Sequence, residues 1–193
     1  MKLLISPGGW AGIGVAIAVV LIIVIWAIVT YNKFVGLGAN SDDAFSGIDV
    51  YLKKRYDLIP NLVETVKGYA KHESETFTKV TEARAKAMSA TTVSEKIAAD
   101  KELTTVLNGF RRVTENYPEL KANTNFLDLQ NQLRVIENEL VNARKYYNAN
   151  VRELNKKIKG FPSLIIAKCM KLKEREYFTI VNSEERENVK VHF

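Results

Sequence analysis

The sequence is poor in residues that build disulfides, metal centres and breaks between helices. Its 193 residues include one cysteine, two histidines, four prolines and ten glycines. A single cysteine, Cys169, cannot form an internal disulfide or a cysteine metal cluster, so cysteine usage does not indicate a redox compartment. Because proline and glycine are the main helix breakers, their scarcity favours long helices.

The familiar catalytic and metal-binding patterns are also missing. His72 and Glu73 lack the second histidine that a helical zinc-protease site needs four residues after the first. No glycine-rich phosphate loop stands between a strand and a helix, and no glutamate precedes a histidine by the three residues typical of a di-metal bundle site. We therefore expect no enzymatic activity, no metal and no cofactor.

One long uncharged stretch dominates what is present. Residues 10–29 read WAGIGVAIAVVLIIVIWAIV, enough helix to cross a hydrocarbon core of roughly 30 Å. Trp10, Trp26 and Tyr31 lie toward its ends, where aromatic rings favour the membrane interface. A cleavable signal peptide would need a shorter apolar region followed by a small-residue cleavage site. We therefore expect a short tail, residues 1–9, and an uncleaved transmembrane anchor, residues 10–31.

The flanks of this anchor leave its orientation open. Lys2 precedes it, and Lys33 is the only basic residue in the twenty that follow residue 29. The positive-inside rule therefore gives close to a tie, and the balance favours a domain outside the cytoplasm. Small residues in the first half of the anchor allow close approach of a second helix, which suggests self-association. They are Gly8, Gly12, Gly14 and Ala18.

Residues 32–162 carry the apolar spacing of amphipathic helices. Pro60 interrupts the first of them; it lacks an amide donor and crowds the carbonyl of Tyr56, which predicts either a turn or a kink. The apolar phase runs in register from Leu52 to Val66 and favours a kinked but continuous helix. Further along, Ser94 can cap the next helix, and Pro118 closes that helix at a turn.

The last long helix has the clearest pattern, an apolar residue at every seventh position. These residues are Phe126, Leu133, Leu140, Tyr147, Leu154 and Phe161. Such a seam packs against other helices, and the core of an antiparallel bundle is favoured over a coiled-coil partner interface. Pro162 then ends the helix. The predicted fold is all-α: an N-terminal transmembrane helix followed by an antiparallel, up-and-down bundle of long helices.

Residues 163–193 form a basic, partly apolar C-terminal segment. From residue 152 to 175, eight basic residues face two acidic ones, and this excess equals the net charge of +6 of the whole chain. Either the segment lies on a membrane surface, or it is a solvated end whose aliphatic residues pack into the bundle, which is favoured. The candidate membrane-surface residues are Lys168, Lys171, Lys173 and Arg175. No nucleic-acid-binding module accompanies them.

Pro60 also decides where this segment ends. If Pro60 makes a turn, four alternating helices bring the segment back to the membrane. If it makes only a kink, three long passes leave the segment at the far side of the bundle.

Several blocks of sequence are distinctive enough to identify a family. They are residues 55–73, 81–84, 115–123, 125–127, 143–144, 147–148, 161–163 and 175–178. Together they closely resemble the LemA family of bacterial membrane proteins. The resemblance implies a single-pass protein of the bacterial cytoplasmic membrane with a helical-bundle domain, no established enzymatic activity and a poorly defined role. A magnetosome membrane protein is similar to this family, which points toward membrane organisation.

Two functional hypotheses follow. The first is a non-enzymatic scaffold that self-associates or organises membrane, with the lipid bilayer and further copies of the chain as partners. The second is an adaptor or regulatory module for a membrane protease or signalling protein. Candidate interaction residues surround the two bends: Arg55, Asp57, Asn61 and Glu64 near Pro60, and Tyr117, Asn123 and Asn125 near Pro118. Arg55 and Asp57 are expected to pair across the first bend, unless they are simply solvated.

Overall fold

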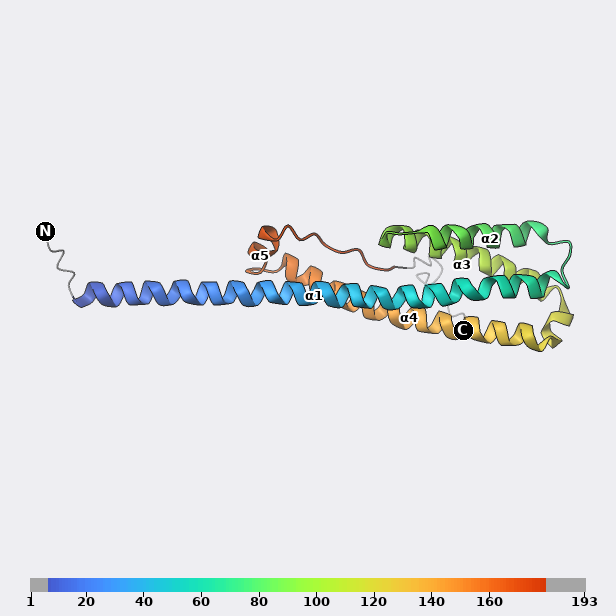
Figure 1. The fold of residues 1–193 in the computed structure, drawn as a ribbon, viewed down its shortest axis with the longest axis horizontal. Coiled ribbons are helices and arrows are strands. Elements are labelled where there is room, and N and C mark those ends of the chain that lie inside the picture. The colour runs from blue at the N-terminus through green and yellow to red at the C-terminus, as the bar shows by residue number, and fades with distance from the viewer. Residues whose placement is uncertain (1–6, 180–193) are drawn as a thin grey trace, which may run out of the picture. The chain divides into compact units, whose positions relative to one another are not determined.

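A computed structural model describes residues 7–179, and every regular element in this range is a helix (Figure 1). The elements are α1 (Pro7–Lys67), α2 (Ser74–Ser89), α3 (Val93–Glu115), the short 3₁₀ helix η1 (Pro118–Ala122), α4 (Thr124–Lys159) and α5 (Leu164–Cys169). The prediction of an all-α protein with a long apolar N-terminal helix and an antiparallel bundle is confirmed.

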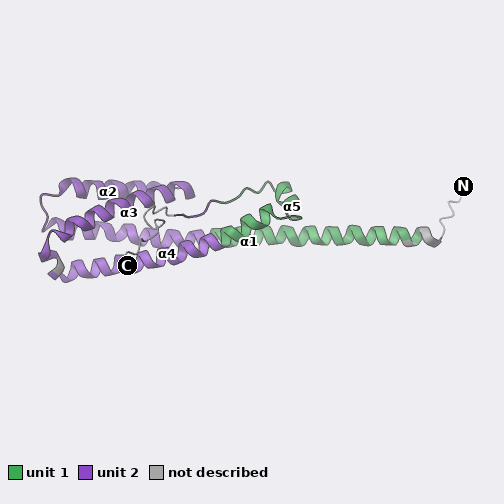
Figure 2. Cartoon of the chain, turned by 180° about the vertical axis from the view of Figure 1, so that it is seen from behind, with its two compact units in different colours: residues 1–42, 150–175 green, residues 43–149, 176–193 purple. Residues whose placement is uncertain are grey.

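The chain divides into two compact units (Figure 2). Unit 1 combines residues 1–42 with residues 150–175, and unit 2 combines residues 43–149 with residues 176–193. Helices α1 and α4 therefore each supply residues to both units, whereas α2, α3 and η1 belong wholly to unit 2.

Unit 1 contains the apolar part of α1. This helix is long and apolar enough to cross a membrane, and none of its most apolar 18-residue window is buried. Toward the end of the apolar stretch, partial burial on α1 begins at Trp26, and Thr30 and Phe34 are buried. Phe34 forms a small apolar cluster with Leu154 and Ile158, against which α5 packs. The packed part of unit 1 thus starts at the last turn of the apolar stretch.

Unit 2 holds the larger core. It is built from buried aliphatic and aromatic side chains, among them Ile48, Leu52, Ile59 and Val66 of α1, Val80 of α2, Leu103 and Phe110 of α3, and Leu133, Leu140 and Tyr147 of α4. The predicted seam of α4, with an apolar residue at every seventh position, is therefore buried inside the protein from Phe126 to Leu154, as a bundle core requires. Its last member differs, since Phe161 lies beyond the end of α4 and is 85% exposed.

Helix α1 runs without a break through Pro60. A proline inside a helix leaves the carbonyl four residues earlier without its usual donor. Here that carbonyl, of Tyr56, accepts a hydrogen bond of 2.7 Å from Nε of Arg84 in α2. A side chain from a neighbouring helix thus replaces the missing backbone bond, and this explains why the helix continues.

The break between the first two helices lies later, between Lys67 and Ser74. The amides of Tyr69 and Ala70 both bond to the carbonyl of Val66, and a tight connection reverses the chain into α2. The prediction that a continuous helix at Pro60 leaves three passes is therefore wrong, because this second break adds a fourth. The C-terminal segment returns to the middle of α1, where the two terminal guanidinium nitrogens of Arg175 bond the carboxylate of Asp42.

The other two prolines lie in connections. Pro118 opens η1, and Pro162 lies between the end of α4 and the start of α5. The start of α3 differs from the prediction by two residues: Thr92, not Ser94, is the N-cap, and it forms a capping box with Glu95. Three hydrogen-bond donors from Thr91 and Thr92 hold the pKa of the exposed Glu95 carboxyl down, at about 2.

Candidate functional site

Three charged side chains from three helices meet inside unit 2. Asp100 of α3 is completely buried. Its Oδ1 accepts a hydrogen bond of 2.8 Å from Arg55 of α1, and its Oδ2 accepts one of 2.7 Å from Arg144 of α4. Arg55 also donates to Thr104 at 3.2 Å and lies 3.6 Å from the partly exposed carboxylate of Glu137. We call Arg55, Asp100 and Arg144 the buried charge cluster.

The cluster has more positive than negative charge at its centre, because two guanidinium groups share one fully buried carboxylate. Burial lowers the pKa of Arg144, and the charge of Asp100 opposes this shift. The Nε atoms of both arginines and the hydroxyl of Tyr56 are buried and have no hydrogen-bond partner in the part of the chain that the structure describes. Burial, reinforced by Asp100, raises the pKa of Tyr56 to about 12.

This chemistry favours a structural role for the cluster. An arginine keeps its proton at all physiological pH values, and a tyrosine with a pKa of about 12 is a poor base at neutral pH. Removing one partner of a buried ion pair typically costs about 3–5 kcal/mol, because the other charge is left in a medium that solvates it poorly. The cluster thus ties α1, α3 and α4 together.

An extended segment lies against α4 beside the cluster. Asn148 uses both ends of its amide, accepting from the backbone N–H of Phe178 at 2.8 Å and donating to its carbonyl at 3.1 Å. In unit 1, Asn155 makes the same pair of bonds to Arg175, at 2.9 and 2.8 Å. Two asparagines one heptad apart thus hold the backbone of residues 175–178, which we call the strap.

The strap covers the buried charge cluster. Phe178 is 2% exposed, and the guanidinium of Arg144 lies 5.0 Å from the centre of its ring, within cation–π range. The hydroxyl of Tyr147 donates to the carbonyl of Glu176 at 3.0 Å. Strap and cluster therefore form one connected arrangement on α4.

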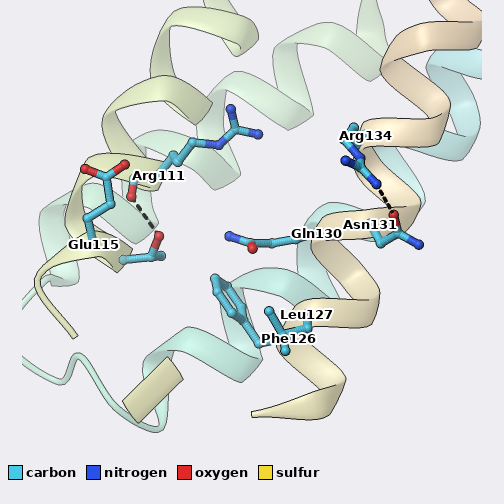
Figure 3. A pocket seen from close by; sticks show the side chains of 8 residues that line it. Arg111, Glu115, Phe126, Leu127, Gln130, Asn131 and Arg134 are labelled. Atoms are coloured by element: carbon cyan, nitrogen blue, oxygen red, sulfur yellow. Dashed lines mark hydrogen bonds between the residues drawn. The ribbon is translucent and has the colours of Figure 1, made fainter. Parts of the chain in front are cut away.

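A polar groove runs between α3 and α4 on the same unit. One end, of about 620 Å³, is bounded by Arg144, Lys145 and Phe178. The other, of about 610 Å³, is shown in Figure 3, where Arg111 on α3 and Arg134 on α4 lie on opposite sides of Gln130. Arg111 lines both ends and a small hollow between them, so we treat them as one groove.

The residues predicted around Pro60 do not form one group. Arg55 lies on the buried face of α1, whereas Asp57, Asn61 and Glu64 lie on its exposed face. Residues two apart on a helix point in nearly opposite directions, so the predicted pairing of Arg55 with Asp57 is wrong. Asp57 instead lies 3.6 Å from Lys53, and Glu64 pairs with Lys67 at 2.6 Å.

The residues predicted around Pro118 serve the chain connections. Asn123 accepts a hydrogen bond of 3.0 Å from the backbone of Phe126 at the start of α4 and donates one of 2.9 Å to the hydroxyl of Tyr69. The hydroxyl of Tyr117 lies 3.5 Å from a carboxylate oxygen of Glu73. Asn125 is exposed. Asn123 and Tyr117 therefore link the α3–α4 connection to the α1–α2 connection.

In unit 1, Lys168, Lys171 and Lys173 are exposed, whereas Arg175 is bonded to Asp42. A side chain at Gly12 or Gly14 would meet no other atom within 4 Å, and Ala18 is exposed. The surroundings of Gly8 lie outside the described residues.

Sequence reasoning did not single out Asp100, Asn148 and Asn155, although a signal for Asp100 was present. Asp100 lies three and seven residues before the buried Leu103 and Leu107, so it occupies the apolar phase of α3. Arg144 similarly falls between Leu140 and Tyr147 on the seam of α4. A charge at a core position signals a buried pair.

Comparison with known proteins gives one consistent answer. The sequence model of the LemA family matches residues 44–193. Protein LemA of Metamycoplasma hominis is 24% identical to this chain over 131 residues, which make up 67% of the chain. The chain matches 60% of the length of that protein.

Proposed function

This chain belongs to the LemA family, and from that premise we propose that it is a non-enzymatic helical scaffold anchored in the bacterial cytoplasmic membrane by α1. The observation that carries this proposal is the apolar window of α1, in which no residue is buried. Apolar surface of this extent is unfavourable in water and is solvated well by lipid. The scaffold alternative is favoured over enzymatic activity because the buried charge cluster offers no ready acid or base at neutral pH.

The C-terminal part of unit 1 supports a second contact with the bilayer. Phe34, against which α5 packs, comes five residues after Val29, which is about 7.5 Å along a helix. Phe161 and Ile165 are exposed on this part of the unit, together with Lys168 and Lys171. Exposed apolar residues interleaved with lysines are typical of segments that bind the surface of an anionic membrane.

This surface contact can be tested with the single cysteine. Cys169 is exposed and can carry an environment-sensitive fluorophore in the full chain, reconstituted into phosphatidylcholine vesicles with or without phosphatidylglycerol. We expect a blue shift that grows with phosphatidylglycerol and weakens in the variant Lys168→Glu/Lys171→Glu. Lys101→Glu/Arg112→Glu, an equal charge change at two exposed positions of α3, is the control. An emission wavelength that changes neither with the phosphatidylglycerol content nor in the variant would contradict surface binding.

We propose that self-association involves the anchor. The seam of α4 is already buried inside the protein, so it is not available for a coiled coil with a second copy. The open surroundings of Gly12 and Gly14 favour contact between anchors. Particles of the full chain in nanodiscs should form an oligomer that disappears when residues 1–31 are removed. A monomer under both conditions would rule out a self-associating scaffold.

We further propose that the domain lies outside the cytoplasm, because the basic residues that flank the anchor favour this orientation slightly. A membrane-impermeant maleimide should then label Cys169 in intact cells. Labelling that requires the membrane to be breached would reverse the orientation.

The second candidate function is an adaptor, and the groove between α3 and α4 favours it. This groove has about 620 Å³ at one end and is lined by polar and charged side chains on the surface of unit 2. Crosslinking from Asn123, next to the groove's first helical turn on α4, should capture a recurrent foreign protein if the chain is an adaptor. Capture of further copies of the chain would favour the scaffold instead.

A further inference from the structure

We infer that the groove between α3 and α4 binds an extended segment of a partner protein that carries an acidic residue flanked by two apolar ones. This inference deepens the adaptor alternative and depends neither on the anchor nor on self-association. It rests on how α4 already holds the strap, on the charge of the groove and on its length.

The strap shows how α4 recognises an extended chain. Its two asparagines bind backbone groups, so the recognition does not depend on the side chains of the bound segment. Asn148 and Asn155 are seven residues apart, about 10.5 Å of helix, and they hold Phe178 and Arg175, three residues apart, about 10 Å of extended chain. One heptad of α4 therefore matches three residues of an extended, antiparallel segment.

The same stripe of α4 continues into the groove. Counting back by sevens from Asn148 gives Val141, Arg134 and Leu127. All three are exposed, and all three line the groove. An extended segment in the register of the strap would thus meet an apolar, a cationic and an apolar position at successive intervals of three residues.

The charge of the groove selects an acidic ligand. Its basic lining residues are Arg55, Arg111, Arg134, Arg144 and Lys145, against two acidic ones, Glu115 and Glu137. Arg55 and Arg144 already share the buried carboxylate of Asp100, which leaves Arg111, Arg134 and Lys145 to attract a ligand. Glu137 already faces Arg55, and among the described residues no carboxylate pairs with Arg111 or Arg134. Arg111 and Arg134 lie on opposite sides of the groove (Figure 3), so a carboxylate between them would meet both guanidinium groups.

The length of the groove selects a peptide over a single anion. From Leu127 to Val141 α4 advances by about 21 Å, the span of about six extended residues. The amides of Asn108, Gln130 and Asn131 line this length and can bond a peptide backbone. The ligand that fits has two apolar residues six apart, with aspartate or glutamate midway between them.

The probe is a fluorescein-labelled peptide with leucine, glutamate and leucine at three-residue spacing and serine or glycine between them. Its anisotropy is measured with the full chain in detergent micelles. We expect saturable binding that weakens at least tenfold in Arg111→Glu/Arg134→Glu. Arg112→Glu, the neighbouring exposed arginine outside the groove lining, should bind as the unmodified chain does. A peptide with lysine in place of glutamate should not bind.

Three results would overturn the inference: no saturable binding, equal binding by the groove variant, or binding only after residues 180–193 are removed. The last would make those residues, which include Glu184, Glu185 and Glu187, the competitor for the groove. Thermal unfolding of each variant checks its fold, since both substituted arginines are exposed. The oligomer in nanodiscs should be the same in all variants, so a failure here is distinguishable from failure of the scaffold proposal.

Discussion

Among single residues, Asp100 is the one whose substitution is expected to lower the free energy of unfolding most. It is the only fully buried partner of two buried guanidinium groups within the cluster. Asp100→Asn should lower the free energy of unfolding by about 3–5 kcal/mol, because it leaves Arg144 buried without a counter-charge and Arg55 with only the partly exposed Glu137. Denaturant titration followed by circular dichroism measures this change.

The matched control for Asp100 is Glu102, on the same helix but in an exposed pair with Lys86. Glu102→Gln should cost less than about 1 kcal/mol, since solvent screens such pairs. Equal losses in the two variants would mean that the buried cluster contributes no more than a surface ion pair.

From the surroundings of Tyr56 we predict how the free energy of unfolding changes at alkaline pH. Its hydroxyl is buried without a partner among the described residues, and burial raises its pKa to about 12 in the folded protein, against the usual 10.0. Because the pKa of Tyr56 is higher in the folded than in the unfolded protein, its contribution to the free energy of unfolding is fully present below pH 10 and is lost as pH rises toward 12. Between these pH values the unmodified chain should lose about 2 kcal/mol more than Tyr56→Phe.

Unfolding free energies of both proteins across this range test the prediction, and the lysines, which also titrate there, are common to both. Near pH 7, Tyr56→Phe should be at least as stable as the unmodified chain, because it removes a buried hydroxyl that makes no hydrogen bond. Parallel curves would contradict the raised pKa.

At the scale of elements, the continuity of α1 depends on a contact between helices. Arg84→Met should cost about 1–3 kcal/mol, because the Tyr56 carbonyl then has no donor. In the background Pro60→Ala the backbone N–H of residue 60 is available to that carbonyl, so the same substitution should cost clearly less. A double-mutant cycle on unfolding free energies measures this coupling, and additive effects would refute it.

The strap is a second element held by few contacts. Asn148→Ala removes both bonds to the backbone of Phe178. Amide hydrogen exchange at Phe178 should accelerate by about tenfold or more, since a net hydrogen bond contributes about 1 kcal/mol, while exchange in α2 should not change. The control is Asn138→Ala, at an exposed position on α4. Unchanged exchange at Phe178 would show that Phe178 holds the strap by its buried ring alone.

At the scale of the whole molecule, the anchor and the bundle should be separable. The buried residues of unit 2 begin at Ala44, so removing residues 1–31 leaves its core intact. Thermal unfolding of unit 2, followed by hydrogen exchange in α2 and α3, should be the same with and without these residues. A clear loss of protection in α3 would show that the bundle depends on the anchor.

The sequence by itself determined the class of the protein. Long uncharged and heptad patterns are local properties, because a helix of fixed period places them on one face whatever the rest of the chain does. Residues 10–29 therefore predict a helix long and apolar enough to cross a membrane, and the seam from Phe126 to Leu154 predicts a buried bundle face. The apolar phase across Pro60 also predicted a continuous helix, and α1 runs through this residue.

Only the tertiary structure decided which distant residues meet. Three contacts join positions that are at least 28 residues apart in the sequence. They are the hydrogen bond from Arg84 to the Tyr56 carbonyl, the carboxylate of Asp100 shared by Arg55 and Arg144, and the bonds from Arg175 to Asp42. No local period encodes such contacts. They depend on where the chain reverses, and the reversal after Lys67 has no proline to mark it. The candidate groove, which lies between two helices, could be seen only once those reversals were known.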